Sequence, residues 1–141
     1  MTAQDYIDHY KMLPHPEGGY YLECFRSEQS LHFPGFDGPR NYSTSILFLL
    51  EAGQTSSLHR IKSDEIWYHH DGGCLVITEI DEQDNHHVTL LGKDFNTGQQ
   101  LQHVVKAGRW FGARPLNTDF VLVGCQVTPG FDFRDFELKN P

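Results

Sequence analysis

One stretch of sequence decides the fold. It reads Gly53-Gln54-Thr55-Ser56-Ser57-Leu58-His59-Arg60-Ile61-Lys62-Ser63-Asp64-Glu65-Ile66-Trp67-Tyr68-His69-His70-Asp71-Gly72. Successive side chains of a β-strand point to opposite faces of the sheet, so Glu65, Trp67 and His69 share one face. The alternate residues Ile66, Tyr68 and His70 occupy the other. Both faces cannot pack into an ordinary apolar core, so the stretch predicts a barrel interior with a polar, aromatic pocket around His59, Glu65 and Trp67.

Outward from this stretch, short alternating segments continue through most of the chain, separated by clusters of Gly, Pro, Asn and Asp. They predict about ten strands. The predicted ranges are 19–26, 42–50, 55–61, 65–70, 74–80, 87–91, 102–105, 109–113 and 120–127, with a last strand from 131 to 138. Segments 81–85 and 94–98 predict hairpin turns. Segment 28–40 contains prolines and glycines that deny it regular pairing, which predicts a surface excursion or a lid over a pocket.

The N-terminal segment 2–11 differs from the rest because its apolar residues recur at helical spacing. Tyr6, Ile7 and Tyr10 predict a short amphipathic helix, with Thr2 as a candidate cap and Pro14 as its end. Strands without intervening helices point to a sandwich or a closed barrel. We therefore expect an all-β domain with a short N-terminal helix, and 141 residues suit a single domain, 1–141.

Composition excludes several classes of function. The formal net charge of −8 argues against a nucleic-acid polymer as partner, because binding phosphates needs a cationic surface. No apolar run approaches the ~20 residues of a membrane helix, so no membrane partner is expected. The N-terminus lacks an export signal, which predicts a cytoplasmic protein. Three widely spaced cysteines fit reduced, buried thiols rather than disulfides, a zinc site or nucleophiles.

The spacing of Gly53, His59, Glu65 and Gly72 resembles the first motif of the cupin superfamily, G(X)5HXH(X)3,4E(X)6G. Ile61 stands where metal-binding cupins have their second histidine. The segment 106–108 resembles the turn of the second cupin motif without its proline, and Phe111 stands where the histidine of that motif would be. Two of the four usual metal ligands are therefore absent.

A closer resemblance, which extends from end to end, is to the small single-domain cupin family of unknown function, Cupin_5. The matching segments are 15–21, 25–27, 43–44, 47–50, 58–60, 63–67, 107–110, 122–125 and 129–133. The chain departs from that family at Phe111, where Gln is usual, and at 72–74, where Gly-Asp-Pro is usual. The resemblance implies a cupin double-stranded β-helix, which is a jelly-roll barrel, and a homodimer.

Three residues are candidates for catalysis: His59, Glu65 and Tyr20. His59 would act as a general base or a metal ligand, or it would simply be a buried histidine bonded to Glu65. Glu65 would orient His59, bind a metal, or pair with Arg26 or Arg60. Tyr20 would return a proton from the opposite face of a substrate.

A second group of residues is predicted to bind the ligand. The arginines suit an anion, the aromatic residues suit stacking or plain core packing, and Glu17 would cap or line the barrel mouth. The predicted ligand-binding residues are Glu17, Arg26, Thr44, Phe48, Ser57, Arg60, Trp67, His69, Trp110 and Phe111.

Three functions compete at this point. The first is binding of a small anionic metabolite, such as a nucleotide or sugar nucleotide, in the barrel. The second is a metal-independent sugar-nucleotide epimerase or isomerase. The third is a metal-dependent cupin enzyme, for which His59 and Glu65 supply only two ligands, and His69 or His103 would have to supply a third. No cofactor is expected beyond a divalent metal at low occupancy.

Overall fold

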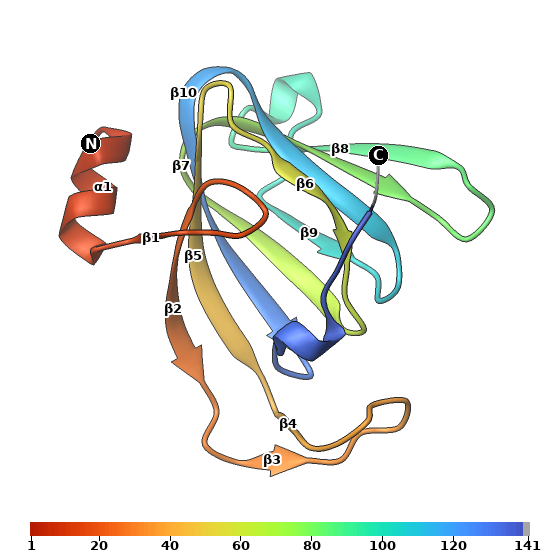
Figure 1. The fold of residues 1–141 in the computed structure, drawn as a ribbon. Helices are drawn as coiled ribbons and strands as arrows, with labels where there is room; N and C mark the ends of the chain where they lie inside the picture. The colour runs from red at the N-terminus through yellow and green to blue at the C-terminus, as the bar shows by residue number, and fades with distance from the viewer. Residues whose placement is uncertain (140–141) are drawn as a thin grey trace.

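The computed structural model describes residues 1–139 and confirms a mostly β chain with one N-terminal α-helix (Figure 1). The elements are α1 (Ala3–Tyr10), β1 (Leu13–Pro14), β2 (Tyr20–Arg26), β3 (Ser30–Leu31), β4 (Arg40–Asn41), β5 (Thr44–Glu51), β6 (Ser56–Arg60), β7 (Asp64–Ile80), β8 (His86–Leu91), the 3-10 helix η1 (Phe95–Thr97), β9 (Gln102–Val105), β10 (Trp110–Thr128), the 3-10 helix η2 (Phe133–Asp135) and β11 (Glu137–Leu138). No helix within residues 1–139 is long and apolar enough to cross a membrane.

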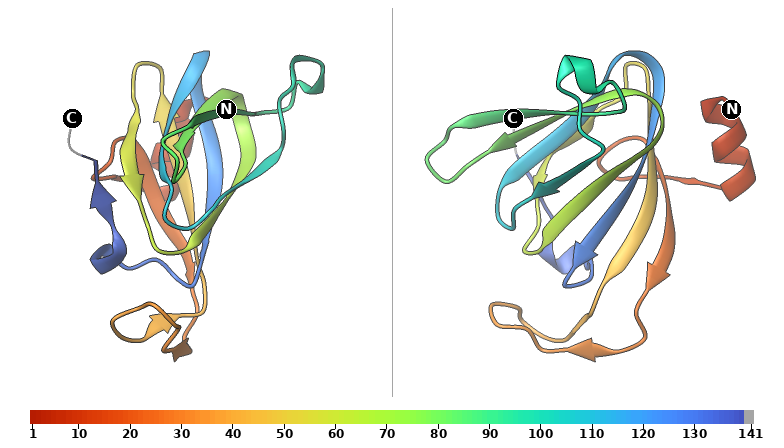
Figure 2. Two further views of the ribbon diagram at one scale, coloured as in Figure 1. Left: turned by 90° about the vertical axis from the view of Figure 1, so that its right-hand side faces the viewer. Right: turned by 180° about the vertical axis from the view of Figure 1, so that it is seen from behind.

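The nine-stranded main sheet is organised around β10, which pairs antiparallel with β5, β6 and β7. The strand order is β1-β2-β5-β10-β6-β11, and β7 adds β8 and β9 beyond β10. Figure 2 shows that the sheet curls on itself. A second, two-stranded sheet of β3 and β4 lies in the excursion between β2 and β5.

Two pairs of predicted strands are fused in the structure. The predicted strands 65–70 and 74–80 form one strand of 17 residues, β7, and the predicted strands 109–113 and 120–127 lie in the 19-residue β10. Glycines at positions 72 and 73 predict a strand end, but Gly72, with a φ of +86°, stays paired with Val121. The glycine backbone bends the strand without breaking the ladder, because no Cβ meets the nearby backbone of Phe120.

Several predicted boundaries need correction. The helix ends at Tyr10 and not at Pro14, because the next residue, Lys11, adopts a left-handed conformation. The predicted cap is confirmed, because Thr2 accepts a hydrogen bond from the Asp5 amide at 3.1 Å. Segment 81–85 is a hairpin turn between β7 and β8, whereas 94–98 contains η1. Segment 131–138 is mostly η2 and its flanks, with only Glu137–Leu138 as strand.

The core consists of two clusters on opposite faces of the sheet. The interior cluster fills the barrel and includes Phe48, Trp67 and Phe111. The other cluster lies under α1 and includes Leu49 and Leu122. Since Phe48 and Leu49 are successive residues of β5, the two-residue period of the strand assigns them to different clusters.

Gly18 closes the turn before β2 and provides a stability test. Its φ is +114°, and a Cβ there would collide with the backbone oxygen of Thr55. Gly53 has a similar φ of +82° but open space around it. Gly18→Ala is therefore expected to cost about 1–3 kcal/mol more unfolding free energy than Gly53→Ala in urea titrations. Equal losses would show that the close approach at Gly18 carries no energy.

Candidate functional site

A cavity of about 60 Å³ lies inside the barrel, and we call it the barrel pocket. Its walls come from the turn before β2, the interior faces of β2, β5, β6, β7 and β10, and the C-terminal segment. The lining residues are His15, Glu17, Tyr21, Glu23, Thr44, Ile46, Phe48, His59, Ile61, Glu65, Trp67, Cys125, Val127, Phe131, Phe133 and Phe136. By volume it suits a few water molecules or the reacting part of a small molecule.

At one wall of the pocket, Glu17 and His59 form a buried ion pair. Nε2 of His59 lies 2.9 Å from Oε2 of Glu17, and the two side chains are only 4% and 7% exposed. Nδ1 of His59 lies 2.7 Å from the carbonyl oxygen of Ser57. Ser56 donates its hydroxyl to the other oxygen of Glu17 at 2.6 Å. Both ring nitrogens therefore face oxygen atoms, an arrangement that favours a doubly protonated, charged imidazole.

The two members of the pair shift each other's pKa. Burial by itself raises the pKa of Glu17, but the hydrogen bond and charge of His59 outweigh it, so the pKa is lowered. Burial by itself lowers the pKa of His59, but the hydrogen bond and charge of Glu17 outweigh it, so the pKa is raised. Both shifts favour the state in which Glu17 is a carboxylate and His59 an imidazolium.

A turn positions Glu17 beside β6. The amide of Gly18 donates to the carbonyl of His15 at 3.0 Å, and the amide of Glu17 donates to Nδ1 of His15 at 3.1 Å. Burial lowers the pKa of His15, which keeps Nδ1 available as an acceptor. The amide of Ser57 then donates to the carbonyl of Glu17 at 2.9 Å. This last bond fixes the turn to β6, which carries His59.

Glu65 is a second carboxyl group in the pocket, in the opposite protonation state. Burial raises its pKa to about 8, while the charge of His59 lowers it and the charge of Glu17 raises it. Its near neighbour Cys125 is equally enclosed, and burial raises the pKa of that thiol well above its usual value. At neutral pH, Glu65 is therefore mostly a neutral carboxylic acid that can donate a hydrogen bond.

Aromatic rings surround these polar groups. Phe136 stacks on the ring of His59 with centroids 5.3 Å apart, and Phe111 lies on the same imidazole at 4.1 Å. Trp67 packs edge-on against Phe48 at 6.2 Å. The indole Nε1 of Trp67 is buried without a hydrogen-bond partner among the described residues. Buried donors are normally paired, so this one is available to a ligand.

Six of the residues predicted for catalysis or binding line the barrel pocket. They are Glu17, Thr44, Phe48, His59, Glu65 and Trp67. The partner expected for His59 needs correction, because the ion pair joins it to Glu17 and not to Glu65. The predicted pairing of Glu65 with Arg26 or Arg60 is also wrong, because these arginines pair with Glu23 and Glu137.

The other predicted residues lie outside the lining of the pocket. Tyr20 packs in the cluster under α1, and its neighbour Tyr21 lines the pocket. The prediction therefore named the wrong one of two adjacent tyrosines on β2. Phe111 is buried behind His59. The guanidinium of Arg60 stacks on Trp110, 4.5 Å from the ring centroid. The rest take part in other contacts: Arg26 at the pocket rim, Ser57 in a groove beside Leu58, and His69 on the carbonyl of Gly73.

Sequence reasoning missed several lining residues. Tyr21 and Glu23 alternate along β2, a signal that the strand prediction contained without fixing which face was interior. Cys125 lies directly opposite Trp67 in the β7–β10 ladder, which only the pairing register reveals. The sequence predicts a strand for the aromatic residues at 131, 133 and 136, whereas they belong to η2 and its flanks.

The family model of Cupin_5, a family of the cupin superfamily also described as DUF985, matches residues 4–139. The chain belongs to the Cupin_5 family. No curated protein matched this Cupin_5 chain. Among solved structures, it resembles a hypothetical protein from Leishmania major at 35% identity and a TM-score of 0.90, with 99% of this chain and 88% of that one covered.

A further relative of this Cupin_5 protein is Protein SO0799 from Shewanella oneidensis, at 38% identity and a TM-score of 0.91, covering 99% of this chain and 85% of that one. A variant of oxalate decarboxylase from Bacillus subtilis shares the fold at 16% identity and a TM-score of 0.66, covering 89% of this chain and 29% of that one. At that identity the likeness shows fold alone. The predicted cupin jelly-roll barrel is confirmed.

The residues of this Cupin_5 protein do not fit the metal of metal-binding cupins. Ile61 lines the pocket where a second histidine ligand would stand, and Phe111 covers His59. Both nitrogens of His59 are already engaged by oxygen atoms. His69 and His103 bond elsewhere, to Gly73 and Glu79. Within residues 1–139, no group of three or more His, Cys, Asp or Glu side chains is placed to hold a metal ion.

The raised pKa of Glu65 predicts a change of stability with pH. A carboxyl group with a folded-state pKa of about 8 favours the folded state at low pH and loses that contribution as pH rises through 8. Glu65→Gln cannot ionise. Between about pH 5 and about pH 8.5, the unfolding free energy of the wild type should therefore fall relative to that of Glu65→Gln by an amount on the order of a few kcal/mol.

Urea unfolding at the two pH values measures this fall. Glu137→Gln, which removes an exposed carboxylate, serves as the control, and the wild type should show no comparable fall relative to it. A constant difference between wild type and Glu65→Gln across the range would mean that Glu65 is ionised throughout.

Proposed function

We propose that the barrel pocket is an acid–base site that moves a proton on a small molecule without a metal, the chemistry of an isomerase or epimerase. One observation carries this proposal: Glu17 and Glu65 line the same pocket with their pKa values shifted in opposite directions. Paired groups whose environments separate their pKa values are typical of acid–base sites.

The proposed reaction divides the roles between the two carboxyl groups. Glu17, held by His59 and Ser56, takes a proton from a carbon next to a carbonyl and becomes a carboxylic acid. Glu65 gives its proton to the carbonyl oxygen and becomes a carboxylate, which leaves an enol. The charge of His59 stabilises the new carboxylate. With a 2-hydroxy carbonyl substrate, Glu17 then gives its proton to the former carbonyl carbon while the 2-hydroxyl proton passes to Glu65, which completes an isomerisation. In an epimerisation, Glu17 loses its proton to solvent, water protonates the first carbon from the opposite face, and the enol proton returns to Glu65.

The charges of the pocket bear on the substrate. Three carboxyl side chains line it, those of Glu17, Glu23 and Glu65, and within residues 1–139 no Lys or Arg joins them. The reacting part of the substrate is therefore uncharged, since an anion there would face the carboxylate of Glu17. Any phosphate of a sugar nucleotide would stay outside, near Arg26, which donates to the carbonyl of Phe131 at 3.0 Å on the rim.

Proton exchange with solvent tests the proposal. In deuterium oxide the intact protein should exchange the acidic C–H of a small enolisable ketose or a 4-keto-sugar nucleotide, as followed by NMR. Glu17→Gln should slow the exchange by about 10²–10⁴-fold, the usual contribution of a general base. Glu137→Gln is the matched control and should exchange at the wild-type rate. If the wild-type protein exchanges the C–H of neither substrate class faster than solvent alone does, the proposal is wrong.

A second candidate is a non-catalytic module that binds a small anionic metabolite, such as a nucleotide or sugar nucleotide. The exposed guanidinium of Arg26 at the rim favours it. Thermal unfolding with nucleotides and sugar phosphates tests it, because a ligand at ~100 times its Kd adds ~2.7 kcal/mol. The gain should vanish in Arg26→Gln and persist in Arg60→Gln. Flat melting curves throughout would exclude this candidate.

The proposal includes two further expectations from the sequence. The chain acts as a homodimer in the cytoplasm, and its partner in the reaction is a small molecule. Its net charge of −8 continues to argue against a nucleic-acid polymer.

A further inference from the structure

The barrel pocket is closed on one side by residues 131–136, which we call the aromatic strap. The strap follows β10 and leads into β11, which pairs with β6 (Figure 1, dark blue). Its three phenylalanines all line the pocket: Phe131, Phe133 and Phe136. They also contact one another edge-on, with centroids between 4.8 and 6.3 Å apart. The strap is thus a single aromatic layer over the pocket.

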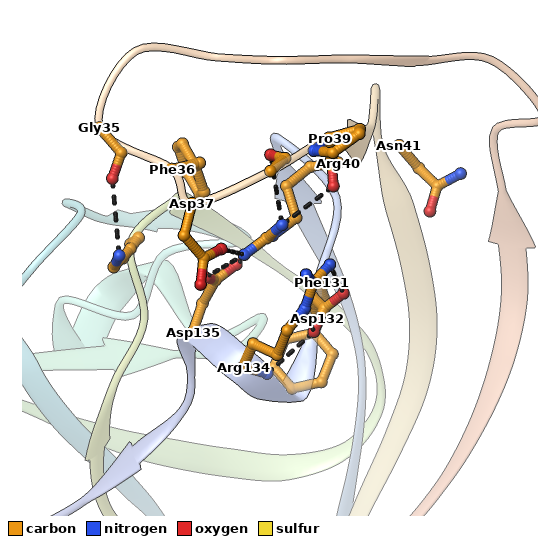
Figure 3. Close-up of polar contacts among 12 residues, drawn as sticks. Gly35, Phe36, Asp37, Pro39, Arg40, Asn41, Phe131, Asp132, Arg134 and Asp135 are labelled. Atoms are coloured by element: carbon orange, nitrogen blue, oxygen red, sulfur yellow. Dashed lines mark hydrogen bonds and ion pairs between the residues drawn. The ribbon is translucent and has the colours of Figure 1, made fainter.

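Arg40 binds the strap at Asp135. Its Nε and Nη2 each donate to one oxygen of Asp135 at 2.8 Å, and the two side chains are only 1% and 5% exposed (Figure 3). Nη1 of Arg40 donates to the carbonyl of Pro39 at 2.9 Å, and Nη2 also pairs with Asp37 at 2.6 Å. A two-pronged pair of this kind fixes orientation as well as distance. Asp135 directly precedes Phe136, the ring that stacks on His59.

A second arginine, at the end of β2, binds the beginning of the strap. Arg26 donates to the carbonyl of Phe131 at 3.0 Å and to Asn41 at 2.8 Å. Arg26 and Arg40 thus flank segment 27–39, whose own side chains do not line the pocket. The excursion predicted as a surface loop or lid therefore contributes no side chain to the pocket lining, and it contacts the strap as well as Lys62 after β6. Between the two holds, Phe133 is 55% exposed, which makes it the least restrained ring of the lining.

We propose that Arg40 is a positioning residue: through Asp135 it keeps the aromatic strap closed over the barrel pocket and holds Phe136 on His59. Small molecules enter when the strap swings outward on the side of Phe133. The inference needs the pocket to admit a small molecule, as the proposed function does, but it does not depend on which reaction follows.

The three cysteines of the chain supply a direct readout. Cys125 lines the pocket behind the strap, and Cys74 is buried elsewhere in β7. The expectation of a buried thiol is wrong for Cys24, which is exposed on β2. In a Cys24→Ser background, alkylation by iodoacetamide can be followed separately at Cys125 and Cys74 by peptide mass spectrometry. Opening of the strap exposes Cys125 alone, whereas general loosening or unfolding exposes both thiols.

The test variant is Asp135→Asn, which weakens the hold of Arg40 while keeping the shape of the side chain. The matched control is Asp132→Asn, in the same strap, whose carboxylate pairs only with the neighbouring Arg134 among the described residues. Asp135→Asn is expected to speed alkylation of Cys125 at least tenfold, with Cys74 unchanged, and Asp132→Asn should change neither. The ring-proton NMR signals of His59 should also shift in Asp135→Asn, as the stacked ring of Phe136 moves away.

Two outcomes overturn the proposal: unchanged alkylation of Cys125 in Asp135→Asn, or equal acceleration at Cys125 and Cys74. Should Asp135→Asn fail to fold, Arg26→Gln removes the donor to the carbonyl of Phe131, together with the contacts of Arg26 to Asn41 and Glu23, and should still speed alkylation of Cys125 alone; an unchanged rate there also contradicts the proposal. No substrate is needed for these measurements. Their result is therefore independent of whether the proton-exchange experiment succeeds.

Discussion

The barrel pocket depends on one buried ion pair. Glu17 and His59 are almost wholly removed from water, and an isolated charge in that position would cost several kcal/mol. Each charge is tolerable only because the other lies 2.9 Å away and because Ser56 and the carbonyl of Ser57 satisfy the remaining hydrogen bonds. The glycine turn before β2 and its backbone bond to β6 follow from this requirement, since they bring the two charges together.

The same pair determines the state of its neighbours. Among residues 1–139 no lysine or arginine pairs with Glu65, so burial outweighs the charge of His59 and keeps Glu65 protonated, and the negative charge of Glu17 adds to that effect. The aromatic rings around the pocket exclude water and thereby strengthen every electrostatic interaction inside it. Where metal-binding cupins carry histidines, this chain has Ile61 and Phe111, and Phe111 packs on His59 at 4.1 Å. In the proposed function, Glu17 and Glu65 take the roles of base and acid.

The fold and half of the site could be predicted from the sequence, because strand alternation is local. Position along β7 is enough to bring Glu65 and Trp67 to one interior face. The partner of His59 could not be predicted, because Glu17 lies 42 residues earlier and reaches it only through the docking of a turn on β6. The sequence cannot distinguish Tyr20 from Tyr21 as the interior residue, because alternation fixes the period of a strand but not which face is interior. The strap was missed because its phenylalanines mimic a strand.

Neutron diffraction from crystals exchanged into deuterium oxide near pH 7 tests the central claim most directly, because it locates the protons. The account predicts deuterium on both ring nitrogens of His59 and on one oxygen of Glu65, with none on Glu17. A bare Glu65, or a neutral His59 beside a protonated Glu17, would contradict it.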